Sequence, residues 1–232
     1  MFDALTPVEW EAIALSIRVS TVAAILSLPF GVAVAWLLAR GRFPGRALVD
    51  AIVHLPLVMP PVVTGYLLLL TFGRKGPAGA FLEHAFGIVF AFRWTGAALA
   101  AAIMGFPLMV RAIRLSLETI DRQLEAAAAT LGANRAMIFV TVTLPLALPG
   151  ILAGLVLGFA RALGEFGATI TFVGNIPGIT QTIPTAIYTD TQVPGGDLAA
   201  LRLTAISVAI AFVALLVADL LARRATRRVL GQ

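Results

Sequence analysis

The sequence predicts an all-α integral membrane protein with about five transmembrane helices, and two observations carry this prediction. Of the 232 residues, 59% are hydrophobic and 12% are charged, whereas soluble domains have about 45–50% apolar and about 25% charged residues. With a mean hydropathy of +0.96, the chain has too little polar surface to cover a water-soluble globule. The apolar residues also gather into stretches of about 20 residues or more, the length that a helix needs to cross the hydrocarbon core.

Five such stretches follow one another along the chain, separated by segments that hold Gly, Pro, Arg or Asp, as expected of span boundaries. They are Ala14–Ala39, Ala51–Phe72, Trp94–Leu115, Leu148–Val173 and Leu203–Ala222. Two shorter apolar segments, 76–92 and 180–192, could each form a further short helix at the outer surface and raise the count to six. The N-terminus lacks the basic n-region of a cleavable signal peptide, so we expect the first span to remain in the mature protein.

The arginines and lysines predict that the N-terminus is outside and the C-terminus inside. In this orientation, eleven of the 17 basic residues lie on the cytoplasmic side: Arg40, Arg42, Arg46, Arg111, Arg114, Arg122, Arg135, Arg223, Arg224, Arg227 and Arg228. Only Arg74, Lys75 and Arg93 lie in an outer loop, and Arg18, Arg161 and Arg202 lie within spans or at their outer ends. Because the basic residues cluster at span ends and form no basic face, we expect the lipid bilayer as a partner and no nucleic acid.

Helix breakers interrupt the second span, which contains Pro56, Pro60, Pro61 and Gly65 within ten residues. A proline removes a helical hydrogen bond, and irregular backbone at membrane depth is tolerated only inside protein or along a water-filled cavity. A single proline is best explained as a packed kink. Four breakers around Thr64 favour a segment that lines a translocation pathway.

The fourth span combines small residues with one pair of opposite charges. Gly150, Gly154 and Gly158 recur at a spacing of four and allow close helix packing. Arg161 and Glu165 are also four residues apart and can pair on one helix face, either to hold the helix in place or to act as a gate. Small and hydroxyl-bearing residues follow and could offer weak, uncharged donors to an anion in transit: Gly167, Thr169, Thr171 and Asn175.

The longest predicted cytoplasmic loop covers about residues 117–147. QLEAAAATLG is rich in strong helix formers, and Gly132 stands where that helix should stop. Helical character resumes after a turn at Ala133–Asn134, and Pro145 and Pro149 mark the entry into the next span. The loop should therefore form two short helices that present a compact surface to a cytosolic partner.

This loop resembles the coupling loop of ABC importer permeases, whose pattern is EAA, three residues, G, nine residues and I-x-LP. The matching and neighbouring positions are Glu125, Ala127, Ala128, Gly132, Ala133, Leu144 and Pro145. Glu125 lies one position earlier than the pattern requires, and Val142 replaces isoleucine. The resemblance implies that the loop docks on a separate ATPase subunit. The chain contains no G-x-x-x-x-G-K-[ST] loop, so we expect no enzyme activity and no cofactor on this chain, with ATP bound by the partner.

Three longer segments are similar to molybdate-type permeases, with sulfate permeases as near relatives. They are Leu55–Leu69, Thr130–Ile151 and Ala160–Tyr188. The resemblance implies one permease domain over residues 1–232 with the type I ABC importer fold, located in the bacterial inner membrane. It further implies a homodimer with two ATPase subunits and a periplasmic binding protein that delivers molybdate or tungstate. The residues alone suit any tetrahedral oxyanion, so sulfate or thiosulfate remains the alternative.

A secondary transporter or channel is a competing class, although such proteins carry several ionisable residues deep in their spans or internal inverted repeats. Here one intramembrane ion pair and no clear repeat are visible. A membrane enzyme is disfavoured as well, because His54 and His84 fall on opposite predicted sides of the membrane and no H-E-x-x-H motif occurs.

Overall fold

A computed structural model describes residues 5–229, without the side chains of residues 218, 219 and 221–229. All regular structure in this part of the chain is helical. The elements are α1 (Pro7–Arg40), α2 (Arg46–Val58), α3 (Pro61–Phe72), α4 (Pro77–Phe86), α5 (Trp94–Thr119), α6 (Arg122–Thr130), α7 (Arg135–Ile138), the π-helix η1 (Phe139–Thr143), α8 (Leu144–Leu163), α9 (Gly167–Val173), α10 (Ile183–Thr191) and α11 (Asp197–Val229).

The predicted count of about five spans is confirmed. Four continuous helices are long and apolar enough to cross a membrane, namely Pro7–Arg40, Trp94–Thr119, Arg135–Leu163 and Asp197–Val217, and the bent pair α2–α3 can provide a fifth span. The two shorter outer segments do contain helices, α4 and α10. With 10 and 9 residues, they are too short to cross the hydrocarbon core, so neither adds a sixth span.

Two predicted spans differ from the structure. The second was expected as one helix over Ala51–Phe72, but it is divided into α2 and α3, which meet at 112°. The fourth was expected over Leu148–Val173, whereas its helix already begins at Arg135 and stops at Leu163, so that α9 is a separate short helix. Hydropathy does not register either break, because the residues next to each break are mostly apolar.

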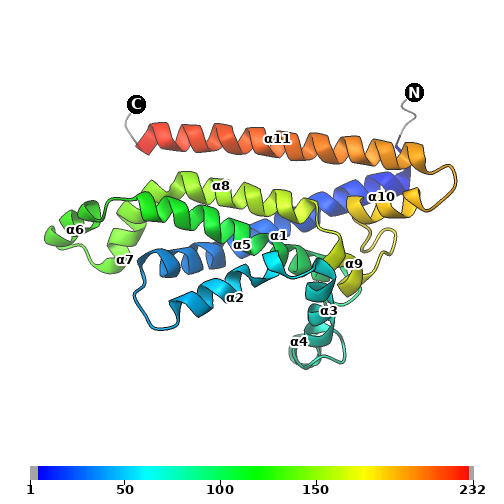
Figure 1. Cartoon of the computed structure of the whole chain (residues 1–232), viewed down its shortest axis with the longest axis horizontal. Coiled ribbons are helices and arrows are strands. Elements are labelled where there is room, and N and C mark those ends of the chain that lie inside the picture. The colour runs from blue at the N-terminus through cyan, green and yellow to red at the C-terminus, as the bar shows by residue number, and fades with distance from the viewer. Residues whose placement is uncertain (1–4, 230–232) are drawn as a thin grey trace.

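Helices α1, α5 and α8 form the centre of the bundle, and α11 lies along α8 at its edge (Figure 1). The glycines of α8 make the contact with α5 close. A Cβ on Gly150 would lie 2.1 Å from the Cβ of Ser116, and one on Gly154 would lie 2.8 Å from the Cγ1 of Ile113. The prediction that these glycines admit a neighbouring helix is therefore confirmed.

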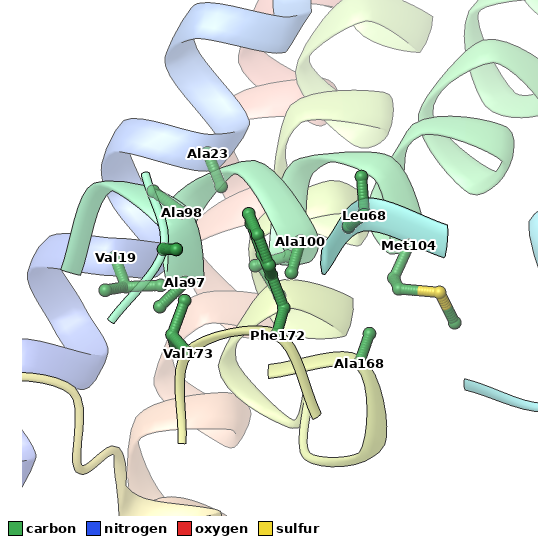
Figure 2. Close-up of a cluster of buried hydrophobic side chains, with 13 residues drawn as sticks. Val19, Ala23, Leu68, Ala97, Ala98, Ala100, Met104, Ala168, Phe172 and Val173 are labelled. Carbon is green, nitrogen blue, oxygen red and sulfur yellow. The ribbon is translucent and has the colours of Figure 1, made fainter. Parts of the chain in front are cut away.

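One hydrophobic cluster attaches the short helix α9 to this bundle. Figure 2 shows Phe172 and Val173 between side chains of α1 and α5, such as Val19 and Ala97, with Leu68 of α3 beside them. Phe172 and Val173 are fully buried. Packing of this kind is the main stabilisation available to a helix of seven residues, which is too short to be stable alone.

The irregular elements gather at the two ends of the bundle (Figure 1). Helices α6 and α7 lie at one end, and α3, α4, α9 and α10 lie at the other. In the predicted orientation, the first end is cytoplasmic and the second is outside. The basic run 223–228 that supports this orientation lies in α11, but its side chains are outside the described part of the structure.

Candidate functional site

The break between α2 and α3 follows from two consecutive prolines. A residue that precedes proline is pushed out of the helical region, and both Met59 and Pro60 precede one. Met59 accordingly has φ −72 and ψ 143, and Pro60 has φ −55 and ψ 132. Two extended residues in succession end α2 and turn the chain by 112° before Pro61 begins α3.

Helix α3 packs directly on α9, so the two segments predicted to line a pathway lie together. A Cβ on Gly65 would lie 2.5 Å from the carbonyl oxygen of Ala168, and one on Gly167 would lie 2.8 Å from the Cβ of Pro61. Gly65 thus allows the backbone of α9 to approach closely, and Gly167 allows the rigid ring of Pro61 to do so. The sequence singled out both glycines but contained no sign that they meet.

Arg161 and Glu165 form the ion pair that their spacing predicts, with Nη1 of Arg161 2.7 Å from Oε2 of Glu165. The Glu165 side chain is 2% exposed and that of Arg161 is 26% exposed. The other carboxylate oxygen of Glu165 accepts a hydrogen bond from the Ala168 amide at 2.8 Å. Glu165 therefore connects the end of α8 to the first turn of α9, where a negative charge also suits the helix dipole.

The predicted hydroxyl and amide donors are already used within the chain to different degrees. Thr171 donates to the carbonyl of Gly167, and Asn175 Nδ2 donates to Thr189 Oγ1 at 2.7 Å. Thr169 is buried beside them. Thr64 is buried as well, and its hydroxyl has no hydrogen-bond partner among the described residues. Among the described residues, the Thr64 hydroxyl and the Oδ1 of Asn175 are therefore buried without a hydrogen-bond partner.

The predicted cytoplasmic loop forms a helical hairpin, which we call the coupling hairpin and define as α6, the turn Leu131–Asn134 and α7. Gly132 has φ 87, the left-handed conformation that ends a helix, as the sequence predicts. Asn134 then caps α7 by accepting a hydrogen bond from the Met137 amide at 2.8 Å. Ala127 is exposed, whereas Ala128 and Ala133 are partly exposed.

Leu131 is a residue of the coupling hairpin that sequence reasoning missed. It is 89% exposed at the turn, although leucine is a residue type often buried in folded proteins. The signal was available, since Leu131 directly precedes the predicted stop glycine. Leu131 is thus open to the surroundings at the tip of the coupling hairpin.

Glu125 holds the coupling hairpin against the membrane helices. Its Oε1 lies 3.1 Å from Nη2 of Arg40 at the end of α1 and accepts a hydrogen bond from Thr143 at 2.9 Å. Arg40 also donates to the carbonyl of Ile120. Glu125, although one position earlier than the motif requires, is thus fixed by an ion pair and a hydrogen bond. The motif did not indicate its partners Arg40 and Thr143.

Leu144 and Pro145 lie inside a continuous helix and not at a loop boundary as expected. The proline ring would clash with the carbonyl four residues earlier in a regular α-helix. The chain avoids this by widening into the π-helix η1, in which the Leu144 amide donates to the carbonyl of Phe139, five residues back. The helix therefore continues from α7 through η1 into α8 without a loop between them.

Residues 27–227 match the family described as "Binding-protein-dependent transport system inner membrane component". The chain belongs to this family. It is 61% identical over 224 residues to the molybdenum transport system permease protein ModB of Escherichia coli K12, which covers 97% of this chain and 98% of the relative. The corresponding ModB of Haemophilus influenzae is 54% identical over 97% of both chains. The sulfate transport system permease protein CysT of Salmonella typhimurium is 42% identical over 74% of this chain and 61% of the relative.

Solved structures of ABC importers share the fold of this permease. A chain of a bacterial alginate importer superposes with a TM-score of 0.70 at 19% identity, covering 96% of this permease and 80% of that chain. A chain of the MetNI methionine transporter superposes with a TM-score of 0.68 at 18% identity, covering 94% of both. The predicted type I importer permease fold is confirmed, as is the resemblance to molybdate-type permeases with sulfate permeases as relatives.

Proposed function

We propose that this chain is the membrane-spanning subunit of an ABC importer that moves molybdate or tungstate into the cytoplasm. The observation that carries the proposal is 61% identity to the Escherichia coli molybdenum permease over 97% of the chain. The matched stretch covers 97% of the chain, so it takes in both the coupling hairpin and the α3–α9 region, and both the motor contact and the route are expected to be shared.

The proposed assembly contains two copies of this chain, two ATPase subunits that bind ATP and a periplasmic oxyanion-binding protein. The exposed turn at Leu131 and Gly132 supports a docking role for the coupling hairpin, in which Glu125, Ala127, Ala128 and Ala133 shape the surface. Its helical continuity with α8, through Leu144 and Pro145, gives the ATPase a mechanical connection to the membrane helices.

The proposed route follows the α3–α9 region and the end of α8. Its residues are Pro60, Pro61, Thr64, Gly65, Arg161, Glu165, Gly167, Thr169, Thr171 and Asn175. The Arg161–Glu165 pair is internally neutralised, so it can stand beside an oxyanion path without trapping a dianion. We infer that the bend at Pro60–Pro61 and the break at Gly164 are the positions where this region opens and closes.

Uptake of radiolabelled molybdate into vesicles that contain the assembled complex tests this function. We expect uptake that depends on ATP and on the binding protein, with strong competition by tungstate and weak competition by sulfate. Stronger competition by sulfate than by tungstate would assign the chain to sulfate import, the alternative that its 42% identity to a sulfate permease supports. Uptake by the purified chain without an ATPase would instead indicate a secondary transporter or channel.

A further inference from the structure

An apolar cavity of about 670 Å³ lies between α1, α2 and α5, and no residue of α3 or α9 lines it. The wall from α1 is one row of side chains at a spacing of four, Val22, Leu26 and Phe30. The wall from α5 is a second such row, in which Ala98 and Ala102 lie between Trp94 and Phe106. Small residues in the middle of one row, opposite large ones in the other, leave a groove that runs along the helices.

Polar side chains contribute almost nothing to this groove. Ser27 and Thr95 line it, but the Ser27 hydroxyl donates to the Ala23 carbonyl at 2.6 Å and that of Thr95 to the Val89 carbonyl at 3.4 Å. Few polar atoms remain to bind a water molecule, which needs two to four partners, or an oxyanion. Its lining suits a hydrocarbon chain.

One positive charge stands at the outer end of the groove. Arg18 is one turn before Val22 on the same face of α1, and its guanidinium lies 3.8 Å from the centroid of the Trp94 ring, which lines the groove. The Arg18 side chain is exposed. Among the described residues it forms no ion pair with a carboxylate.

The position of Arg18 along α1 places it at the outer membrane boundary. It precedes Arg40, at the inner end of the helix, by 22 residues, or about 33 Å at a rise of about 1.5 Å per residue. The hydrocarbon core is about 30 Å thick, so a core that ends at Arg40 on the inside ends near Arg18 on the outside. Trp94 begins α5 at the same level, as tryptophans at the headgroup region do.

We propose that the groove binds one phospholipid of the surrounding bilayer, with an acyl chain between α1, α2 and α5 and the phosphate on Arg18. The face of the guanidinium rests on the Trp94 ring, and its N–H donors remain free for phosphate oxygens. Arginine can stack and donate at the same time, which a lysine ammonium cannot do as well. The lipid would fill the space between α2 and the bundle. This site is separate from the oxyanion route, because the residues of the two do not overlap.

The experiment places the photoreactive residue p-benzoylphenylalanine at Leu26 in the assembled complex in membranes and identifies the adduct by mass spectrometry. We expect a phospholipid adduct whose yield falls about tenfold in Arg18→Leu, as loss of one charge-assisted contact predicts, and falls similarly in Ala102→Phe, which fills the groove. Arg74→Leu, in an outer loop, is the matched charge control and should leave the yield unchanged.

A second photoprobe at Phe212, an exposed residue of α11, separates a specific site from ordinary contact with the bilayer, since its lipid adducts should not respond to Arg18→Leu. Cross-linking of Leu26 to a second copy of this chain or to another protein would overturn the proposal. A lipid adduct at Leu26 that is insensitive to both groove variants would overturn it as well.

Discussion

Gly132 occupies a left-handed conformation at the turn of the coupling hairpin, with φ 87 and open space where a side chain would be. A non-glycine residue in this conformation costs about 1–2 kcal/mol, so a substitution strains the turn without a steric clash. Gly195, in the loop before α11, has the same properties with φ 84. The same substitution at the two glycines therefore distinguishes the effect of local backbone strain from the effect of a role in coupling.

Gly132→Val should reduce ATP-driven uptake while membrane insertion and expression persist, because it displaces the turn that we propose docks on the ATPase. Uptake and ATPase activity of the reconstituted complex, measured together, check this. Gly195→Val imposes similar strain at the opposite end of the bundle and should leave coupling intact. Equal uptake by wild type and Gly132→Val would refute the docking surface.

The ion pair at the end of α8 is unequal, because Glu165 is buried and Arg161 is partly exposed. Arg161→Leu leaves a buried carboxylate without a countercharge and should destabilise the protein by on the order of 3 kcal/mol. Glu165→Gln keeps the shape and an acceptor for the Ala168 amide, so it should cost less. Thermal melting of the purified variants shows which substitution lowers the stability more. A larger loss of stability in Glu165→Gln than in Arg161→Leu would contradict this account.

At the scale of elements, the short helices α3 and α9 depend on each other and on the central bundle. Their glycines bring the two backbones together, and Phe172 and Val173 attach α9 to α1 and α5. Both helices border a backbone break, at Pro60–Pro61 and at Gly164. The pair is therefore one packed unit that joins the rest of the chain at two backbone breaks and is held on the long helices by Phe172 and Val173.

Cysteines at Thr64 and Thr169 should react with aqueous reagents in only some nucleotide states, because both side chains are buried in this conformation. Labelling of the reconstituted complex with and without ATP measures this. Thr71→Cys, an exposed hydroxyl position on the same α3, should react equally in every state. Protection of both sites in all states would exclude them from the route.

The sequence anticipated elements to different degrees for physical reasons. Gly132 and the Arg161–Glu165 pair were predictable because a stop glycine and an i, i+4 pair are local. The 112° turn was not, although Pro60 and Pro61 were recognised as breakers, because a proline does not specify how far a helix bends. The uninterrupted passage through Pro145 escaped prediction, since a π-helix leaves no hydrophobic period of its own.

At the scale of the whole molecule, polar contacts join the outer ends of α1, α10 and α11. Arg202 lies 2.9 Å from Glu9, and the Ile183 amide donates to Ser16 Oγ at 2.7 Å. Asp190, on α10, lies near this cluster, and among the described residues it forms no ion pair. Burial, and then the charge of Glu9, raise the pKa of the Asp190 carboxyl above its ordinary value of 3.8, although the charge of Arg202 partly offsets this rise.

Asp190→Asn should stabilise the protein at pH 7. The folded state favours the protonated form of Asp190 more than the unfolded state does. The stability that this carboxyl contributes is therefore complete below pH 3.8 and is lost as the pH rises. The variant should therefore melt higher than wild type at neutral pH, and the difference should shrink on acidification towards pH 4. Glu83→Gln, an exposed carboxylate on α4, is the control, and a destabilised Asp190→Asn would contradict this sign.

Composition and pattern by themselves determined the membrane class, about five spans, the coupling hairpin and the family resemblance. These properties depend on hydrophobicity and on spacings within one segment, which the chain carries locally. Only the tertiary structure decided that α3 meets α9, that Glu125 binds Arg40, and that α1 and α5 leave an apolar groove below Arg18. Each of these joins residues far apart in sequence, and such pairings follow from how whole helices pack.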